Sequence, residues 1–187
     1  MGNYFIGYGV GEALWHGITS PPPGEGLWWV HPDDLHLTIA FLGSIPEERA
    51  RTCFQWVCEQ ELSPLRGTLG PAIPLGSRPP ASAFARPLEE GFESAVENLQ
   101  RLGPPLLACA GRPPETRAPL PHITILRARN STSPAVRQQA EEWLRKRTQG
   151  RVSIHLSQIG LYGWAVDRTE RRYRLLDSVQ LPNRITG

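Results

Sequence analysis

The sequence contains almost no lysine. Of its 20 basic residues only Lys146 is a lysine, and the other 19 are arginines. Arginine presents a planar set of donors that suits phosphate and carboxylate groups, so this bias is compatible with a phosphate-bearing partner. A GC-rich genome would produce the same bias without any function. The formal net charge of +2 argues against a protein that wraps a long polyanion.

Cysteine is also scarce, and long hydrophobic runs are absent. The three cysteines, Cys53, Cys58 and Cys109, are an odd number, whereas a disulfide framework needs pairs, so we expect a reducing cytoplasm and no metal bound through them. No apolar run approaches the roughly 20 residues of a membrane span. The segment Met1 to Val10 lacks the basic region and apolar run of a signal peptide. These features predict a soluble cytoplasmic protein without a membrane segment.

The chain is long enough for one large domain or two small lobes, and its 18 glycines and 19 prolines indicate many turns between short elements. A capping box from Ser44 to Glu47 predicts one helix start, Gly103-Pro104 predicts a helix end, and Ser133-Pro134 predicts another start. Periodicity predicts strands at 4–10, 35–42, 68–75, 81–86, 106–110, 122–128, 152–162 and 172–179, and helices at 13–18, 47–63, 89–102 and 134–150. This mixture is typical of an α+β fold.

One strand-helix unit occurs twice. The segments 36–39 and 122–125 both read His-x-Thr-Ile, and each is followed by a proline after 10 or 12 residues and by a tryptophan after 20 or 21. Chance would produce His-x-Thr-Ile only about 0.01 to 0.02 times in this composition, so the repeat is informative. The repeat predicts two similar lobes related by a pseudo-two-fold axis.

The repeated motif places a histidine and a threonine on the same side of a strand. Residues i and i+2 share a face, about 6.5 to 7 Å apart, so His36 and Thr38 point one way while Leu37, Ile39 and Phe41 point toward a core. The same alternation applies to the second copy, in which His122 and Thr124 share a face. If the lobes bring these faces together, a cleft would hold two imidazoles and two hydroxyls around a space the size of a phosphate.

This set of groups suits in-line displacement at phosphorus. One imidazole must accept a proton from the attacking oxygen and the other must donate one to the leaving oxygen, and histidine supplies both states near neutral pH. The threonine hydroxyls can donate to the non-bridging oxygens as their charge grows. This scheme requires no metal.

Three other interpretations compete with this one. Each histidine could be a core residue beside an ordinary strand-forming threonine. The segment from His31 to His36, with Asp33 and Asp34, mixes imidazole and carboxylate and could support a metal-dependent phosphohydrolase. The chain could also be a non-catalytic nucleotide- or RNA-binding module that keeps the cleft without turnover.

The motifs resemble those of a known family. The segments 36–43, HLTIAFLG, and 121–127, PHITILR, resemble the two signature motifs of the two-histidine phosphoesterases, specifically the LigT-like RNA 2′,3′-cyclic phosphodiesterases, historically called 2′-5′ RNA ligases. Trp29-Val30, the strand around Phe84 and Arg172-Tyr173 extend the resemblance over nearly the whole chain. It implies one bilobal α+β domain over residues 1–187, with two antiparallel sheets and flanking helices around a central cleft. It further implies a monomer without cofactor that opens 2′,3′-cyclic phosphates of RNA ends or nucleosides to 2′-phosphomonoesters, with 2′-5′ ligation as the reverse reaction.

The resemblance also implies roles for particular residues. His36 and His122 would be the catalytic pair, with His122 as the base that activates water and His36 as the acid that protonates O3′. Thr38 and Thr124 would hold the phosphate.

Four further residues are candidates for substrate binding. Arg127 matches the arginine that ends the second family motif, although strict alternation places it on the face opposite His122, so it reaches the cleft only if the strand bends. Phe84, Trp29 and Tyr8 are candidates for stacking on a base.

Overall fold

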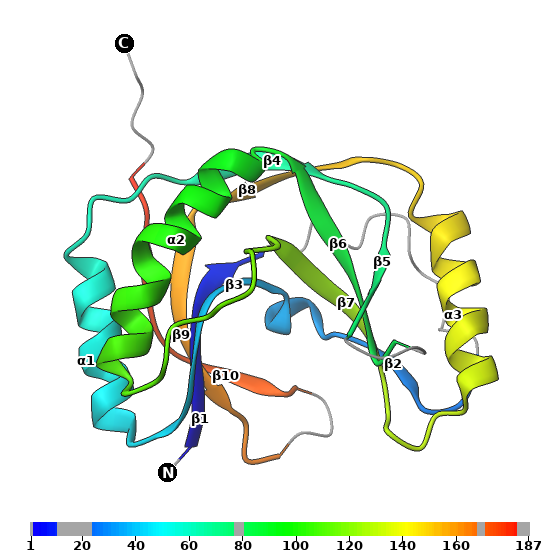
Figure 1. The fold of residues 1–187 in the computed structure, drawn as a ribbon, viewed down its shortest axis with the longest axis horizontal. Coiled ribbons are helices and arrows are strands. Elements are labelled where there is room, and N and C mark those ends of the chain that lie inside the picture. Colours follow the sequence, from blue (N-terminus) through cyan, green and yellow to red (C-terminus); the bar gives the residue numbers. More distant parts are fainter. Residues whose placement is uncertain (1, 11–23, 77–80, 168–170, 183–187) are drawn as a thin grey trace.

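The computed structural model describes residues 2–10, 24–76, 81–167 and 171–182, and it shows an α+β fold (Figure 1). The strands are β1 Gly2–Gly9, β2 Leu27–Trp29, β3 His36–Ile45, β4 Leu65–Leu69, β5 Ile73–Leu75, β6 Ala83–Glu90, β7 His122–Ala128, β8 Val152–Leu156, β9 Gln158–Trp164 and β10 Tyr173–Gln180. The helices are α1 Glu47–Cys58, α2 Phe92–Cys109 and α3 Pro134–Arg147, with a 3-10 turn, η2, at Pro32–Asp34.

The strands form one antiparallel path that divides into two halves. The order is β10-β9-β1-β3-β7-β6-β4-β8, with β2 on β7 and β5 on β6. The two halves meet at β3 and β7, whose only paired residues are Leu37 and Ile123. Each half therefore begins at one His-x-Thr strand and extends outward through three more strands, which is consistent with the two expected lobes.

The helices cover the outer side of these strands. In Figure 1, α1 and α2 lie side by side along the half that contains β1, β3 and β9, and α3 lies at the other end of the molecule. Helix α1 buries Ala50, Cys53, Phe54 and Val57 in the hydrophobic core, whereas Cys58 at its end is exposed. No helix in the described ranges combines the length and the hydrophobicity that a membrane crossing needs.

The repeated strand-helix unit is present. Strand β3 leads into α1, and β7 leads into α3, where the Ser133 hydroxyl accepts a hydrogen bond from Val136 N as the sequence predicts. The capping box predicted at Ser44 is wrong, because Ser44 belongs to β3 and Pro46 occupies the N-cap position without a side-chain hydrogen bond. The helix expected at 13–18 lies outside the described residues.

Helix α2 continues through the predicted stop. Gly103, Pro104 and Pro105 lie inside the helix, and the strand expected at 106–110 is instead its last turn. The apolar face explains this difference, since Leu102 and Leu106 on both sides of the prolines are fully buried. Packing of this face outweighs the local cost of proline in a helix interior.

Two predicted strands are each divided in the structure. The segment expected as one strand over 68–75 is interrupted at Gly70–Ala72 between β4 and β5. The segment over 152–162 breaks at Ser157, so that β8 pairs with β4 in one half and β9 pairs with β1 in the other. Ser157 therefore marks the passage of the chain from one half to the other.

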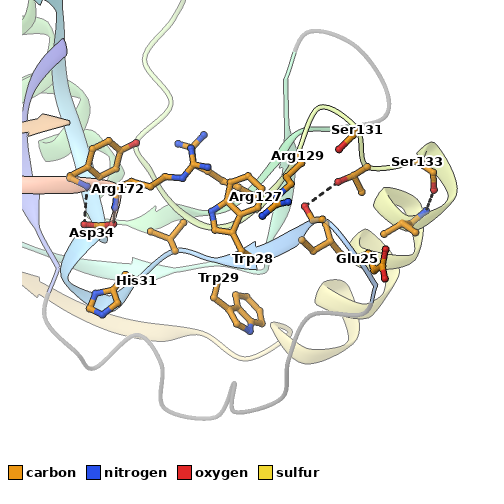
Figure 2. A pocket seen from close by; sticks show the side chains of 16 residues that line it. Glu25, Trp28, Trp29, His31, Asp34, Arg127, Arg129, Ser131, Ser133 and Arg172 are labelled. Carbon is orange, nitrogen blue, oxygen red and sulfur yellow. Dashed lines mark hydrogen bonds between the residues drawn. The ribbon is translucent and has the colours of Figure 1, made fainter. Parts of the chain in front are cut away.

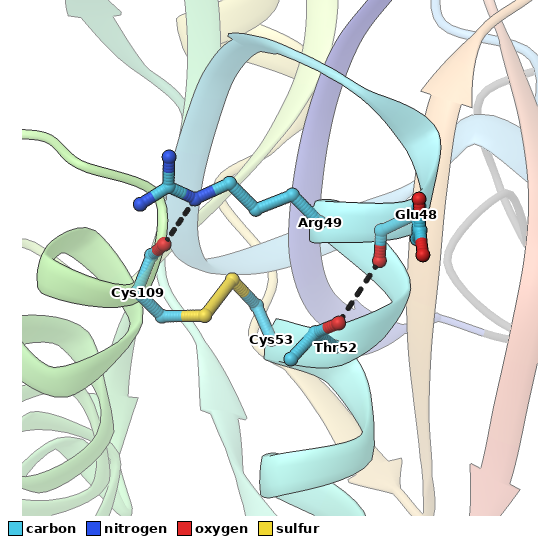
Figure 3. The surroundings of a disulfide bond; sticks show 5 residues. All are labelled: Glu48, Arg49, Thr52, Cys53 and Cys109. Carbon is cyan, nitrogen blue, oxygen red and sulfur yellow. Dashed lines mark hydrogen bonds between the residues drawn. A yellow bond between two sulfur atoms is a disulfide. The ribbon is translucent and has the colours of Figure 1, made fainter.

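Two of the three cysteines form a disulfide, which the odd cysteine count did not lead us to expect. Cys53 of α1 and Cys109 at the end of α2 form a disulfide with their Cα atoms 5.9 Å apart, which leaves Cys58 free (Figure 3). Beside the bridge, Arg49 Nε donates to the Cys109 carbonyl at 2.7 Å. An odd cysteine count excludes complete pairing, but it does not exclude one bridge between two neighbouring helices.

Candidate active site

The two His-x-Thr strands bring their polar side chains to one face. Leu37 and Ile123, the paired residues, are both 0% exposed and point into the core. His36 and Thr38 on β3 are half-buried on the other face, as are His122 and Thr124 on β7. Because the strands are antiparallel, His36 lies toward Thr124 and Thr38 lies toward His122. The structure thus unites the four predicted residues in one constellation.

A β-bulge in each strand adds a third residue to this face. On β7, Thr124 pairs with Ala85 and Leu126 with Phe84, so Ile125 is an extra residue between them. An extra residue reverses the alternation beyond it, and Arg127 returns to the face of His122 and Thr124. The bulge therefore places the Arg127 side chain on the same face as the two polar residues, which strict alternation along the strand would not do.

The same bulge occurs in β3. Gly7 pairs with Thr38 and Ile6 with Ala40, which leaves Ile39 as the extra residue. Phe41, expected to face the core, is instead 42% exposed on the face of His36 and Thr38, with the Arg112 guanidinium 5.4 Å from its ring centre. Phe41 and Arg127 therefore occupy equivalent positions in the two halves.

Both imidazoles are held by the main chain just before their strands. His36 Nδ1–H donates to the Asp34 carbonyl, and His122 Nδ1–H donates to the Leu120 carbonyl, each at 2.6 Å. A carbonyl oxygen only accepts hydrogen bonds, so Nδ1 carries the proton in both rings. In the neutral tautomer, Nε2 is then left as the free nitrogen that can accept or donate a proton.

Burial makes both imidazoles harder to protonate. It lowers the pKa of His36 from 6.5 to about 4, and the positive charges of Arg127 and His122 act in the same direction, against the hydrogen bond to Asp34. Burial also lowers the pKa of His122, and the charge of Arg127 adds to the effect. Both rings are therefore mainly neutral at pH 7 in the empty cleft.

Small residues on the adjacent strands leave room above the threonines. Gly9 and Gly7 pair with His36 and Thr38 in the first half, and Ala85 pairs with Thr124 in the second. A Cβ atom at Gly7 would lie only 2.7 Å from the Leu37 carbonyl oxygen, so a side chain there would displace β3. The close approach of β1 to β3 at this point depends on glycine.

Three aromatic rings surround His36. The Phe5 ring lies 4.3 Å from the imidazole centre and stacks on Tyr162 at 4.9 Å, and Tyr173 meets the imidazole edge-on at 5.4 Å. Phe5 and Tyr162 are 3% and 4% exposed. These rings exclude water from the imidazole, and this burial lowers the pKa of His36. No pattern in the sequence indicates that they surround the histidine.

Asp34 connects His36 to β10. Its carboxylate is buried and accepts hydrogen bonds from Arg172 N at 2.6 Å and Tyr173 N at 3.4 Å, while its carbonyl holds the imidazole of His36. This carboxylate is occupied by the main chain, which disfavours the metal-site interpretation. In the described part of the chain, no three His, Cys, Asp or Glu side chains form a group that could hold a metal.

A pocket of about 770 Å³ adjoins this constellation (Figure 2). Its lining includes Asp34 and Tyr173 beside His36, Arg127 at the end of β7, and Trp28, which pairs with Arg127 across β2 and β7. The pocket extends from the face of the two histidines toward the start of α3.

The predicted base-stacking residues are not on this face. Phe84 and Tyr8 are 1% and 0% exposed in the hydrophobic core, so both predictions were wrong. The Trp29 ring packs 5.7 Å from Trp143, and Figure 2 shows it on the side of β2 away from Trp28. Trp28 and Trp29 are neighbours on β2, so their side chains point to opposite sides of the strand. The sequence does not show which of them shares the face of Arg127, because it does not show that β2 pairs with β7.

The double role of Asp34 leads to a test of the site's framework. In Asp34→Asn, an amide N–H group replaces an oxygen that faces main-chain N–H donors, so the free energy of unfolding should fall by about 1–3 kcal/mol. Urea denaturation measures this change. The matched control is Asp33→Asn, whose side chain is 54% exposed beside Arg171, and whose effect should stay within about 0.5 kcal/mol. Equal effects of the two substitutions would contradict the role of Asp34.

Comparison by sequence gives one family match. The family model described as LigT-like phosphoesterase matches residues 15–64, which contain the first His-x-Thr strand. No curated protein matches the sequence at a significant level.

Comparison by structure extends over the whole fold. A crystal structure described only as a phosphoesterase has a TM-score of 0.70 at 22% identity, covering 97% of this chain and 99% of the other. E. coli LigT complexed with 3′-AMP has a TM-score of 0.68 at 21% identity, with coverages of 97% and 99%. The same protein complexed with NADP+ has a TM-score of 0.66 at 21% identity, with coverages of 97% and 98%. The structural matches show that this chain has the fold of LigT, and the family match together with the two His-x-Thr strands shows that it resembles the LigT-like phosphoesterases.

Proposed function

We propose that this protein is an RNA 2′,3′-cyclic phosphodiesterase that opens cyclic phosphate ends to 2′-phosphomonoesters by two-histidine acid-base catalysis, without a metal. One observation carries the proposal. His36 and His122 lie on one face across a single antiparallel pair, and the Nδ1 of each ring is fixed by the carbonyl two residues before it, just ahead of the strand. An in-line displacement needs one group to accept a proton from the attacking oxygen and another to donate a proton to the leaving oxygen, and two imidazoles with a free Nε2 can do this.

The reaction transfers one proton at each side of phosphorus. A water oxygen attacks phosphorus while the base takes its proton, and the bond from phosphorus to O3′ breaks as the acid donates a proton to O3′. We assign His122 as the base and His36 as the acid. The resting pKa order does not fix these roles, because the negative charge of the substrate raises both pKa values.

The remaining residues of the face bind the substrate. Thr38 and Thr124 lie between the imidazoles and can donate hydrogen bonds to the non-bridging oxygens. Arg127, returned to this face by the bulge at Ile125, can neutralise charge on the phosphate. Phe41 replaces Phe84 as the candidate for stacking on the base, since it is exposed beside Thr38.

A ligation activity and a nucleotide preference follow from the same site. If the 5′-hydroxyl of a second RNA end replaces water, its oxygen attacks the cyclic phosphate, the base takes its proton, and the bond from phosphorus to O3′ breaks as the acid protonates O3′. The product is a 2′-5′ phosphodiester, so 2′-5′ ligation is the second activity that we propose. The complexes of LigT with 3′-AMP and NADP+ support a nucleotide ligand for this chain. Their ligands share the phosphorylated adenosine that an RNA end also contains.

Substitution of the two histidines tests the proposal. His36→Ala and His122→Ala should each lower kcat/KM for cytidine 2′,3′-cyclic phosphate by roughly 10²- to 10⁴-fold, because each variant loses one proton transfer. Initial rates measured by chromatography, with and without EDTA, give this result. His155→Ala is the control, since His155 is exposed on β8 and should keep the wild-type rate.

Two outcomes would overturn this assignment. Loss of wild-type activity in EDTA would show that a metal takes part. Binding of the cyclic nucleotide without any turnover would instead favour the non-catalytic binding module.

The pH dependence provides a separate test. The productive free enzyme has one neutral and one protonated imidazole, and this form is most populated between the two pKa values. The pKa of His36 is about 4 and that of His122 lies below 6.5. A bell-shaped profile of kcat/KM with its maximum below pH 6.5 is therefore expected, falling at low pH as the base is protonated and at high pH as the acid loses its proton. A maximum well above pH 7 would contradict it.

A further inference from the structure

We propose that the pocket around Trp28 is a second nucleotide subsite, which binds the nucleotide that precedes the cyclic phosphate in an RNA chain. The inference rests on the proposed function and specifies its substrate as an oligonucleotide end. Three observations support it: the position of the pocket, its charge and its flat π surface.

The pocket is continuous with the catalytic face. Tyr173 lines the pocket and meets the His36 imidazole at 5.4 Å, and Arg127 lines both the pocket and the phosphate site. The cavity of about 770 Å³ lies in the roughly 300–1,000 Å³ range of small-ligand sites. A chain whose terminal phosphate lies between His36 and His122 can therefore continue directly into it.

Among the described residues that line the pocket, positive charges outnumber negative ones. They include Arg127, Arg129 and Arg172, against the carboxylates of Glu25 and Asp34. The Asp34 carboxylate is 2% exposed and already accepts hydrogen bonds from main-chain N–H groups. The charge of these side chains favours an anionic ligand, and guanidinium groups suit the phosphodiester on the 5′ side of the terminal nucleoside.

The pocket also offers a surface on which a base can stack. Trp28 pairs with Arg127 and shares its face, and the Arg172 guanidinium lies over the Trp28 ring at 4.4 Å from its centre (Figure 2). Bases stack both on aromatic rings and on guanidinium planes in proteins that bind single-stranded RNA. The combination of a ring with flanking arginines favours a nucleotide over a simple inorganic anion.

The test compares two substrates that share one cyclic end. Wild-type kcat/KM should be about tenfold or more higher for a dinucleotide that ends in cytidine 2′,3′-cyclic phosphate than for the free cyclic mononucleotide, because stacking contributes only for the dinucleotide. Trp28→Ala and Arg172→Ala should each bring this ratio close to one. Trp164→Ala removes a 39% exposed tryptophan outside the pocket and should leave the ratio unchanged.

The outcomes separate the subsite from the catalytic proposal. Equal wild-type kcat/KM values for the two substrates, or a ratio that Arg172→Ala does not change, would overturn the subsite while the phosphodiesterase function stands. If the protein hydrolyses neither substrate, the proposed function fails. Quenching of tryptophan fluorescence by the dinucleotide and the mononucleotide 2′-phosphates then tests the subsite, which equal affinities would overturn.

Discussion

The whole site depends on one contact, the antiparallel pairing of Leu37 with Ile123. This pair joins the two halves of the strand path, and its two apolar side chains are fully buried. Because side chains alternate along a strand, burying these residues forces the histidine and threonine on either side of each onto the opposite face. A hydrophobic contact between two strands that are distant in sequence thus places four polar side chains on the same face.

The environment of the imidazoles follows from this arrangement. Each ring donates its Nδ1–H to the carbonyl two residues earlier, so the tautomer is fixed by the segment that leads into each strand. Around His36 the rings of Phe5, Tyr162 and Tyr173 exclude water, which lowers its pKa. The two halves therefore hold their histidines in the same way, but the surroundings of the two rings differ.

The sequence predicted the repeated unit and the shared face of its histidines and threonines, because both follow from local patterns. The bulges at Ile39 and Ile125 could not be predicted, since adjacent apolar residues look the same in a buried strand with or without an extra residue. They decide which way Phe41 and Arg127 point. The disulfide and the continuation of α2 beyond Pro104 and Pro105 could not be predicted either, because both depend on packing between elements that are distant in sequence. Asp34 looked like a turn residue because its main-chain partners lie on β10.

We propose that His122 is the base and His36 is the acid, and a change of leaving group tests this assignment most directly. When sulfur replaces O3′ in the cyclic phosphate, the leaving group departs without being protonated, so the general acid is no longer needed. On this substrate His36→Ala is expected to approach the wild-type rate, whereas His122→Ala should remain as impaired as on the oxygen substrate. Equal impairment of the two variants on the sulfur substrate would contradict the account.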